Sequence, residues 1–208
     1  MKSNSLLLVI SAPSGAGKTT VTRGLLKAFP EIQFSVSMCT RPKRDNERDG
    51  IDYFFVSKEN FKDCMARGDL IEWTKIYDDY YGTTKRVVED MLSAGVNVIF
   101  DIDSKGARAI KELYPDNAVL IFILPPFMED LRIRLLGRMT DSQEDIEKRL
   151  QGAEEELRAF SIYDYWIINE DVDISIERLK TIIIAEKCRL KRIPQEIKER
   201  FNILQDNI

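Results

Sequence analysis

Four short stretches of the chain are almost continuously apolar, which is the pattern of strands buried on both faces of a sheet. They read LLLVIS (6–11), VNVIFDID (96–103), AVLIFIL (118–124) and YWIIN (165–169). Segments with helical periodicity lie between them, and this alternation of strand and helix is typical of parallel sheets. We therefore predict an α/β fold in which helices cover both faces of a parallel sheet.

The intervening segments carry apolar residues three and four positions apart, as amphipathic helices require. The pattern predicts helices over residues 18–29, 84–95, 144–160 and 173–190. Pro30 ends the first of them. Gly95 is suited to end the second, because glycine tolerates the positive φ of a helix C-terminus.

Three other segments depart from this alternation. Residues 34–84 show short alternating runs, the charged loop RPKRDNERDG and the turn DDYYGTT, so we interpret them as a small β-rich lobe inserted into the core. Residues 129–149 are helical in pattern and rich in arginine. Residues 193–208 are either a helical extension or a frayed tail, and their sequence leaves the choice open.

The composition is that of a globular protein rather than a disordered one, since 44% of the 208 residues are hydrophobic and 32% are charged. A net charge of −4 and a pI of about 5.2 argue against general affinity for nucleic acids or membrane surfaces. No run approaches the ~20 apolar residues of a membrane span, and the N-terminus lacks the apolar region of a secretory signal. The three cysteines are widely spaced, which favours a reducing compartment, so we expect a cytoplasmic protein.

The chain contains no histidine, and this restricts its chemistry. The absence excludes Ser-His-Asp and Cys-His nucleophile systems and the usual general base near neutral pH. Catalysis would have to depend on lysine, arginine, carboxylates and a bound cation.

The stretch VISAPSGAGKTT joins the first apolar run to the first helix. A glycine-rich loop at this point turns backbone N–H groups and the helix N-terminus toward an anion. Lys18 would reach the outer phosphates of a nucleoside triphosphate, and the Thr19 hydroxyl would bind Mg²⁺. Ala12 replaces the first glycine of the G-x-x-x-x-G-K-[ST] pattern, which alanine can do where φ stays negative. We interpret the loop as a site for ATP; the alternative is a turn that only connects strand and helix.

Within VNVIFDID, Asp101 stands at the end of the predicted buried strand, where P-loop proteins hold Mg²⁺, often through water. We expect Thr19 and Asp101 to hold Mg²⁺ with ATP, partly through water. Asp101 is also placed to cap the following helix, and the two roles are compatible.

The predicted lobe carries arginines, phenols and a carboxylate in a combination that fits a nucleoside monophosphate. Arg41 and Arg44 with Tyr53 and Tyr81 suit a phosphate monoester, since the guanidinium fork matches phosphate geometry. Glu72, between apolar neighbours, suits a base edge with two N–H donors, as guanine has. Taken singly, each has another explanation: a solvated charge run, aromatic residues at the edge of a core, or an exposed strand position.

Seven motifs together resemble guanylate kinases in order and spacing, from about residue 6 to residue 187. They are SAPSGAGKTT, FSVSMCTRPKR, GIDYFFVS, GDLIEWTKIYDDYYGTT, FDIDSKGA, RIRLLGRMT and IEKRLQGAEEEL. The resemblance implies a P-loop NTPase-type core with a β-rich GMP-binding lobe and a small helical lid. It also implies transfer of the ATP γ-phosphoryl group to GMP or dGMP, which yields GDP or dGDP in purine nucleotide metabolism and GMP recycling.

The resemblance assigns roles to individual positions. It implies ATP binding by Ala12, Pro13, Ser14, Gly15, Ala16, Gly17, Lys18, Thr19, Thr20 and Asn169. It implies that the GMP phosphate is bound by Arg41, Arg44, Tyr53 and Tyr81, and the guanine by Ser37, Glu72, Thr83 and Asp103. It implies that the transferring phosphoryl group is surrounded by Lys18, Arg41, Arg134, Arg138 and Arg149. Pairing with Glu129 and Asp130 on the surface is the alternative for Arg134 and Arg138, which are four residues apart.

We expect the chain to divide into a core segment with the P-loop (1–33), the GMP-binding lobe (34–86), a second core segment (87–128), the lid (129–149) and a last core segment with the C-terminal helix (150–208). The expected partners are small-molecule nucleotides, with no nucleic acid and no membrane. The sequence leaves open whether the chain is a monomer or a homo-oligomer.

Two places depart from the family pattern. Ser104-Lys105 replaces the usual apolar residue and glutamine, and Met139 follows Arg138 where glycine is usual. These changes affect local loop geometry rather than the reaction.

Two other functions stay as alternatives: a non-catalytic scaffold domain, which typically has a degraded phosphate loop, and a P-loop kinase for another acceptor such as AMP, UMP or a ribose bisphosphate. The complete GAGKT sequence argues against the first, and Glu72 with Thr83 favours guanine over the second.

Overall fold

The computed structural model describes residues 5–45, 47–76, 78–136 and 143–203. Its strands are β1 (Leu7–Ser11), β2 (Ile32–Phe34), β3 (Met38–Cys39), β4 (Phe54–Phe55), β5 (Leu70–Ile76), β6 (Asp79–Thr84), β7 (Asn97–Asp101), β8 (Ala118–Leu124) and β9 (Tyr165–Ile168). Its helices are α1 (Lys18–Ala28), α2 (Lys58–Arg67), α3 (Lys85–Ser93), α4 (Ser104–Leu113), α5 (Met128–Leu136), α6 (Gln143–Arg158), α7 (Val172–Lys187) and α8 (Gln195–Arg200), with short 3₁₀ turns η1 (Phe160–Ile162) and η2 (Leu190–Arg192).

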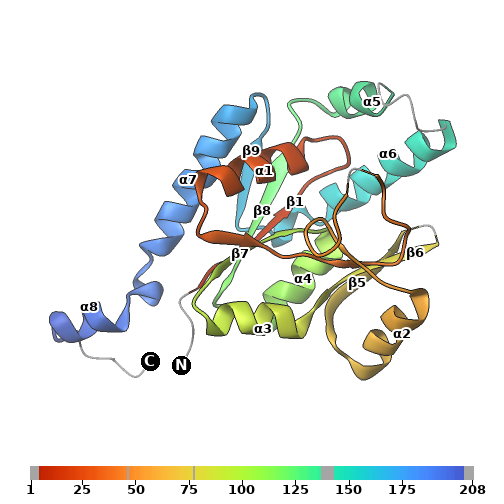
Figure 1. Cartoon of the computed structure of the whole chain (residues 1–208). Helices are drawn as coiled ribbons and strands as arrows, with labels where there is room; N and C mark the ends of the chain where they lie inside the picture. The colour runs from red at the N-terminus through yellow and green to blue at the C-terminus, as the bar shows by residue number, and fades with distance from the viewer. Residues whose placement is uncertain (1–4, 46, 77, 137–142, 204–208) are drawn as a thin grey trace.

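The core is a parallel sheet in the order β2-β7-β1-β8-β9 (Figure 1). The central strand β1 is buried along its whole length, and Val9 lies opposite Phe100 of β7 and Leu120 of β8. The predicted α/β fold with a parallel sheet is confirmed. Strand β2 was not predicted, because three residues are too few for an alternation of polar and apolar positions to be recognised.

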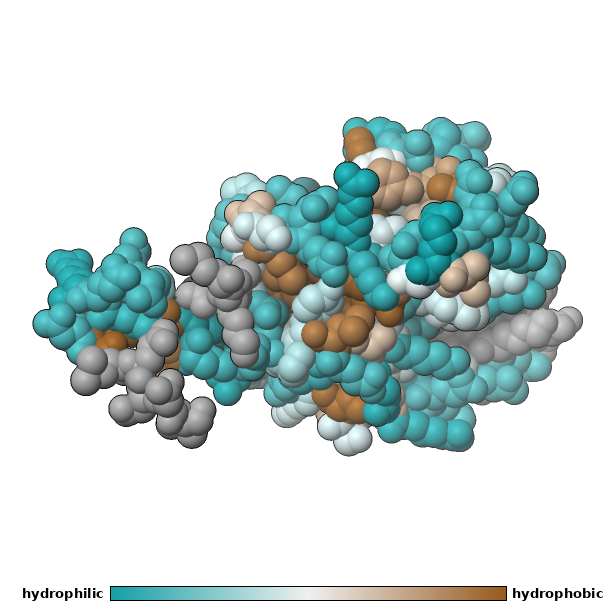
Figure 2. Space-filling view, turned by 90° about the horizontal axis from the view of Figure 1, so that it is seen from below, coloured by the Kyte–Doolittle hydropathy of each residue, from teal (hydrophilic) through white to brown (hydrophobic). Residues whose placement is uncertain are grey.

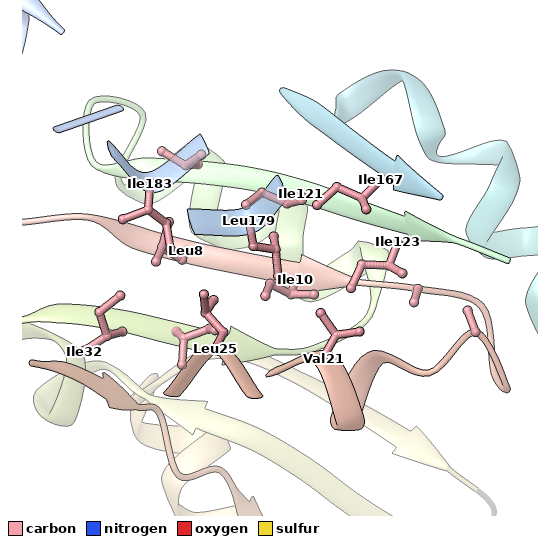
Figure 3. Close-up of a cluster of buried hydrophobic side chains, with 14 of the residues drawn as sticks. Leu8, Ile10, Val21, Leu25, Ile32, Ile121, Ile123, Ile167, Leu179 and Ile183 are labelled. Carbon is pink, nitrogen blue, oxygen red and sulfur yellow. The ribbon is translucent and has the colours of Figure 1, made fainter. Parts of the chain in front are cut away.

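Two hydrophobic clusters hold the helices to the sheet. One packs α1 and α7 against one face, where Val21 and Leu25 meet Leu179 and Ile183 around the side chains of β1 (Figure 3). The other packs α3 and α4 against the opposite face, around Phe100. Burial on both faces explains why these strands read as continuous apolar runs.

A second sheet, in the order β4-β3-β6-β5, forms a lobe beside the core together with α2 (Figure 1). Phe61 of α2 is fully buried and stacks on Tyr80 with ring centroids 5.4 Å apart. The antiparallel pairing of β5 with β6 sets Glu72 opposite Thr83. The lobe thus presents two polar side chains on neighbouring strands at its contact with the core.

The arginine-rich segment predicted over residues 129–149 includes most of α5 and the start of α6. Between them, residues 137–142 lie outside the described residues. At the other end of the chain, α8 stands away from the body of the molecule (Figure 1). Seen from below, the surface is largely hydrophilic and its hydrophobic residues form separate small patches (Figure 2). Among the described helices, none combines the length and the apolar character needed to cross a bilayer.

Candidate functional site

The loop between β1 and α1 has the backbone of a phosphate cradle. Gly15 and Gly17 have φ of 94° and 90°, a region that side chains with a Cβ rarely adopt. The Ala16 N–H donates to the Pro13 carbonyl at 3.1 Å, which closes the loop above the N-terminus of α1. The loop borders a cavity of about 450 Å³, here called the P-loop cavity. Its walls are formed by Ala12, Pro13, Ser14, Gly15, Gly17, Lys18, Thr19, Thr20, Asp103, Gly152 and Glu156.

Asn169, expected to bind ATP, lies behind the loop instead of in the cavity wall. Its side chain is 3% exposed; the amide nitrogen donates to the Ala16 carbonyl at 2.7 Å, and the amide oxygen accepts from the Ser175 hydroxyl at 2.9 Å. A Cβ at Gly17 would collide with the same amide, so both space and backbone conformation require glycine there. The geometry of Asn169 therefore suits support of the phosphate loop.

A second cavity of about 350 Å³, here called the lobe cavity, opens between the small sheet and the core. Its walls are formed by Lys18, Ser37, Arg41, Arg44, Tyr53, Glu72, Thr74, Ile76, Tyr81, Gly82, Asp101, Ile102 and Asp103. Seven of the eight residues expected to bind GMP are in this set, and the eighth, Thr83, contacts two of them. Lys18 and Asp103 line both cavities, so the two spaces meet at these side chains.

Lys18 forms an ion pair with Asp101, whose carboxylate oxygen is 2.5 Å from the ammonium nitrogen, and donates to the Ile102 carbonyl at 3.3 Å. The capping role left open for Asp101 belongs instead to Asp103, which accepts the Gly106 N–H at 2.8 Å as N-cap of α4. Asp101 ends β7 three residues before α4 begins at Ser104, whereas the N-cap is the residue directly before the helix.

One group of polar side chains at the lobe cavity is joined by hydrogen-bonding contacts. The Thr83 hydroxyl donates to Glu72 at 2.6 Å and lies 3.4 Å from the Ser37 hydroxyl. Burial, with a smaller contribution from the nearby Asp103, raises the pKa of Glu72 to about 7, although the hydrogen bond from Thr83 acts in the opposite direction. A buried acceptor that titrates near neutrality can receive two N–H donors when ionised.

A second group of side chains in the lobe cavity is cationic and aromatic. The Arg41 guanidinium lies 5.1 Å from the centre of the Tyr53 ring, and the Tyr53 and Tyr81 rings meet edge to face at 5.9 Å. Burial raises the pKa of Tyr53, and it raises that of Tyr81 to about 12, so both phenols keep their protons for donation. Such a set of donors fits a phosphate monoester.

Sequence reasoning missed Glu47, which holds Arg41 in place. Two hydrogen bonds of 2.6 Å join its carboxylate to the two terminal nitrogens of Arg41, and the Arg44 N–H donates to it at 3.0 Å. Hydrogen bonding to Arg41 lowers the pKa of Glu47 to about 2. Its position in the charged loop RPKRDNERDG gave no signal, because any of the three acidic residues there could have paired with an arginine.

Two of the three arginines expected in the lid belong to described helices. Position 134 is in α5 and position 149 in α6, and of both only the backbone placement is described; Arg138 lies outside the described residues. Gly152 and Glu156 of α6, which the sequence did not single out, border the P-loop cavity. Periodicity along α6 was recognised as helical, but no pattern marked which of its faces would meet the loop.

The donor set near Lys18 fits a magnesium ion. Thr19 lies in the wall of the P-loop cavity and Asp101 at the end of β7, so one hydroxyl and one carboxylate are at hand. Within residues 5–45, 47–76, 78–136 and 143–203, no three Cys, Asp or Glu residues converge as a complete metal cage. One or two protein oxygens are what Mg²⁺ uses when phosphates and waters complete its shell.

Comparison with known proteins agrees with this arrangement. A family model described as guanylate kinase matches residues 4–186. The chain is 45% identical over 208 residues to a guanylate kinase of Syntrophotalea carbinolica, covering 100% of this chain and 99% of the relative, and 47% identical over 191 residues to that of Symbiobacterium thermophilum, covering 92% and 90%. A crystal structure of guanylate kinase from Anaplasma phagocytophilum superposes with a TM-score of 0.78 at 34% identity, covering 98% of this chain and 99% of that one. The chain therefore belongs to the guanylate kinase family, the ATP-dependent kinases that phosphorylate GMP to GDP.

Proposed function

We propose that the chain transfers the γ-phosphoryl group of ATP directly, in line, to the phosphate of GMP, with ATP in the P-loop cavity and GMP in the lobe cavity. The observation that carries the proposal is that Lys18 and Asp103 belong to the walls of both cavities. Two nucleotides in these spaces would meet at Lys18 with their phosphates facing each other. No covalent enzyme intermediate is needed in this geometry.

The acceptor needs no general base. A phosphate monoester has its second pKa near 6, so it is largely dianionic at pH 7 and already nucleophilic. The obstacle is the repulsion between two anions, and cations with backbone N–H groups remove it. A chain without histidine is sufficient for this chemistry.

We assign the GMP phosphate to Arg41, Arg44, Tyr53 and Tyr81, and the guanine to Ser37, Glu72, Thr83 and Asp103. The donors Arg41, Tyr53 and Tyr81 form one contacting group in the cavity and the acceptor Glu72 belongs to another with Thr83 and Ser37, which supports this assignment. None of the assigned contacts addresses the ribose 2′ position, so we expect dGMP to be accepted as well.

We assign Lys18, Arg41, Arg134, Arg138 and Arg149 to the charge of the transferring phosphoryl group. The lid, residues 129–149, would bring its three arginines over the γ-phosphate and exclude water, which limits hydrolysis of ATP. Mg²⁺ held by Thr19 and Asp101, partly through water, would neutralise charge on the ATP phosphates.

With three cysteines that form no disulfide, the chain suits the reducing cytoplasm in which we expect it to act.

A nucleotide panel tests the proposal. The purified protein is given Mg²⁺ and ATP with GMP, dGMP, AMP, UMP or CMP, and ADP is measured in a coupled assay. We expect rapid ADP formation with GMP and dGMP and little with the others. Equal rates with AMP would contradict the guanine assignment, and a rate independent of any acceptor would contradict direct transfer.

A further inference from the structure

Glu156, in the last turn of α6, is bound to the first residue of α4. The Ser104 N–H donates to its two carboxylate oxygens at 3.1 and 3.3 Å, and the Ser104 hydroxyl donates to Oε1 at 3.1 Å. These contacts, here called the Glu156–Ser104 clasp, join residues 52 positions apart in the sequence. The clasp connects the helix that continues from the lid to the turn that follows β7.

The face of α6 that carries Glu156 is the face toward ATP. Positions 149, 152 and 156 are three and four residues apart, so they share one side of the helix. Gly152 and Glu156 border the P-loop cavity, and position 149 belongs to the same side one turn earlier. Any rotation or shift of α6 would therefore displace position 149 relative to the phosphates.

The other half of the clasp follows a residue assigned to guanine. Ser104 comes directly after Asp103, which lines both cavities and caps α4 through Gly106. Burial and the neighbouring Asp103 raise the pKa of Glu156, while the hydrogen bonds from Ser104 favour its ionised form. The positive end of α4 adds to this stabilisation, which explains how a carboxylate can stand beside a triphosphate site.

We propose that Glu156 is a positioning residue for phosphoryl transfer: bound by Ser104, it fixes the stem of the lid, and with it position 149, against the turn that carries Asp103. The inference deepens the proposed function and rests on its assignment of Arg149. Because the clasp contacts neither the γ-phosphoryl group nor GMP in this assignment, its loss should lower kcat and leave both KM values nearly unchanged.

A double-mutant cycle tests the clasp, with Ser104→Ala, Glu156→Ala and the double variant assayed by steady-state kinetics. Ser104→Ala removes one hydrogen bond to a charged acceptor, so we expect kcat to fall about tenfold. Glu156→Ala removes all three bonds, and we expect a loss on the order of 10²-fold. In the Glu156→Ala background, Ser104→Ala should have no further effect, since the two residues act through one contact. Ser104→Thr, which keeps the hydroxyl, should restore kcat.

Ser57→Ala is the matched control, because Ser57 is also a serine at a helix N-terminus, where its hydroxyl accepts the Asn60 N–H at 3.1 Å, away from both cavities. It should leave kcat unchanged, and circular dichroism should show all variants folded. The inference is overturned if Ser104→Ala leaves kcat unchanged, lowers it equally in both backgrounds, or raises the KM for GMP in its place. Arg149→Ala separates this failure from that of the proposed function: normal turnover in that variant would refute the lid assignment itself.

Discussion

Glu47 holds Arg41 by two hydrogen bonds without being part of the lobe cavity wall. The pair uses the two terminal nitrogens of the guanidinium, so the Nε–H is not among the donors to Glu47. With Arg41 assigned to the GMP phosphate as proposed, Glu47 would act on GMP through Arg41.

We expect Glu47→Ala to raise the KM for GMP about tenfold, because Arg41 loses two charge-assisted hydrogen bonds and must be ordered by the substrate itself. Binding of guanosine, which has no phosphate, should be unchanged by calorimetry. Asp69→Ala, which breaks the surface pair of Asp69 with Arg67 at 2.7 Å, is the control and should alter neither value. A lower KM for GMP in Glu47→Ala would mean that Glu47 competes with the phosphate for Arg41.

Glu72 should make GMP binding depend on pH. Its pKa is raised to about 7 by burial, and only the ionised carboxylate accepts both guanine donors. The KM for GMP should therefore fall as the pH rises through 7. This fall is in addition to any change near pH 6, where the GMP phosphate itself loses its second proton. The effect of Glu72 on the free energy of unfolding has the opposite pH dependence. Because its pKa is raised in the folded protein, Glu72 stabilises the fold fully below its unfolded-state pKa of about 4.5, and this stabilisation is lost as the pH rises through 7.

Glu72→Gln provides the control for this titration. The variant should lose the component near pH 7 and keep the one near pH 6, measured as KM for GMP between pH 5.5 and 9. It should also bind GMP about 1–3 kcal/mol more weakly, since an amide leaves guanine donors poorly matched. An unchanged pH profile, or an unchanged preference for GMP over AMP, would remove Glu72 from the guanine site.

Among the elements, the phosphate loop depends on β9 and α7 as much as on its own glycines. Asn169 follows β9 and Ser175 lies in α7, and together they fix the Ala16 carbonyl from behind. A loop with two residues at positive φ is held in its cradle conformation by this buried amide.

We expect Asn169→Ala to destabilise the protein by about 1–3 kcal/mol, because a buried carbonyl and a buried hydroxyl lose their partner. The KM for ATP and for GTP as donors should rise by the same factor, since the change is in the phosphate loop and not at the base. Ser175→Ala removes only the hydrogen bond to the Asn169 amide oxygen and keeps the one from the amide nitrogen to Ala16. It should therefore lower the melting temperature and raise the KM of the donors by less than Asn169→Ala does. If ATP alone were affected, Asn169 would act at the adenine base and not through the phosphate loop.

Across the molecule, the C-terminal segment is tied to the core by a buried charge pair remote from both cavities. Glu186 of α7 and Arg192 of η2 are 1% and 5% exposed, with Oε2 and Nη2 3.5 Å apart, and Tyr165 of β9 donates to Glu186 at 2.7 Å. Such a pair is costly to break on one side only, because the remaining charge stays buried.

Arg192→Leu should lower the free energy of unfolding by about 3 kcal/mol, the low end for a broken buried pair, since Arg189 still contacts Glu186. Glu186→Leu combined with Arg192→Leu should recover most of the loss in urea denaturation. Turnover with GMP should be normal in every variant that is folded, because neither residue lines a cavity. A selective loss of kcat would instead connect the C-terminal segment to the active site.

Much of the fold was predictable because its signals are local. The runs that became β1, β7, β8 and β9 are apolar along nearly their full length, and α6 lies within two residues of the predicted range 144–160. The small sheet was predictable only as a β-rich region, since β3 and β4 have two residues each and gain their form from pairing with other strands.

The amino-acid order alone determined the phosphate loop, since Gly15 and Gly17 permit backbone angles that their neighbours do not, and this depends on each residue and not on distant ones. It also determined the apolar strands that support that loop. Only the tertiary structure decided which acidic residues pair with the site. Glu47 contacts Arg41, Glu72 contacts Thr83 and Glu156 contacts Ser104. The physical reason is that a carboxylate has many candidate partners in a chain with 35 acidic and 31 basic residues, and only the packed path of the backbone brings one of them within hydrogen-bonding distance.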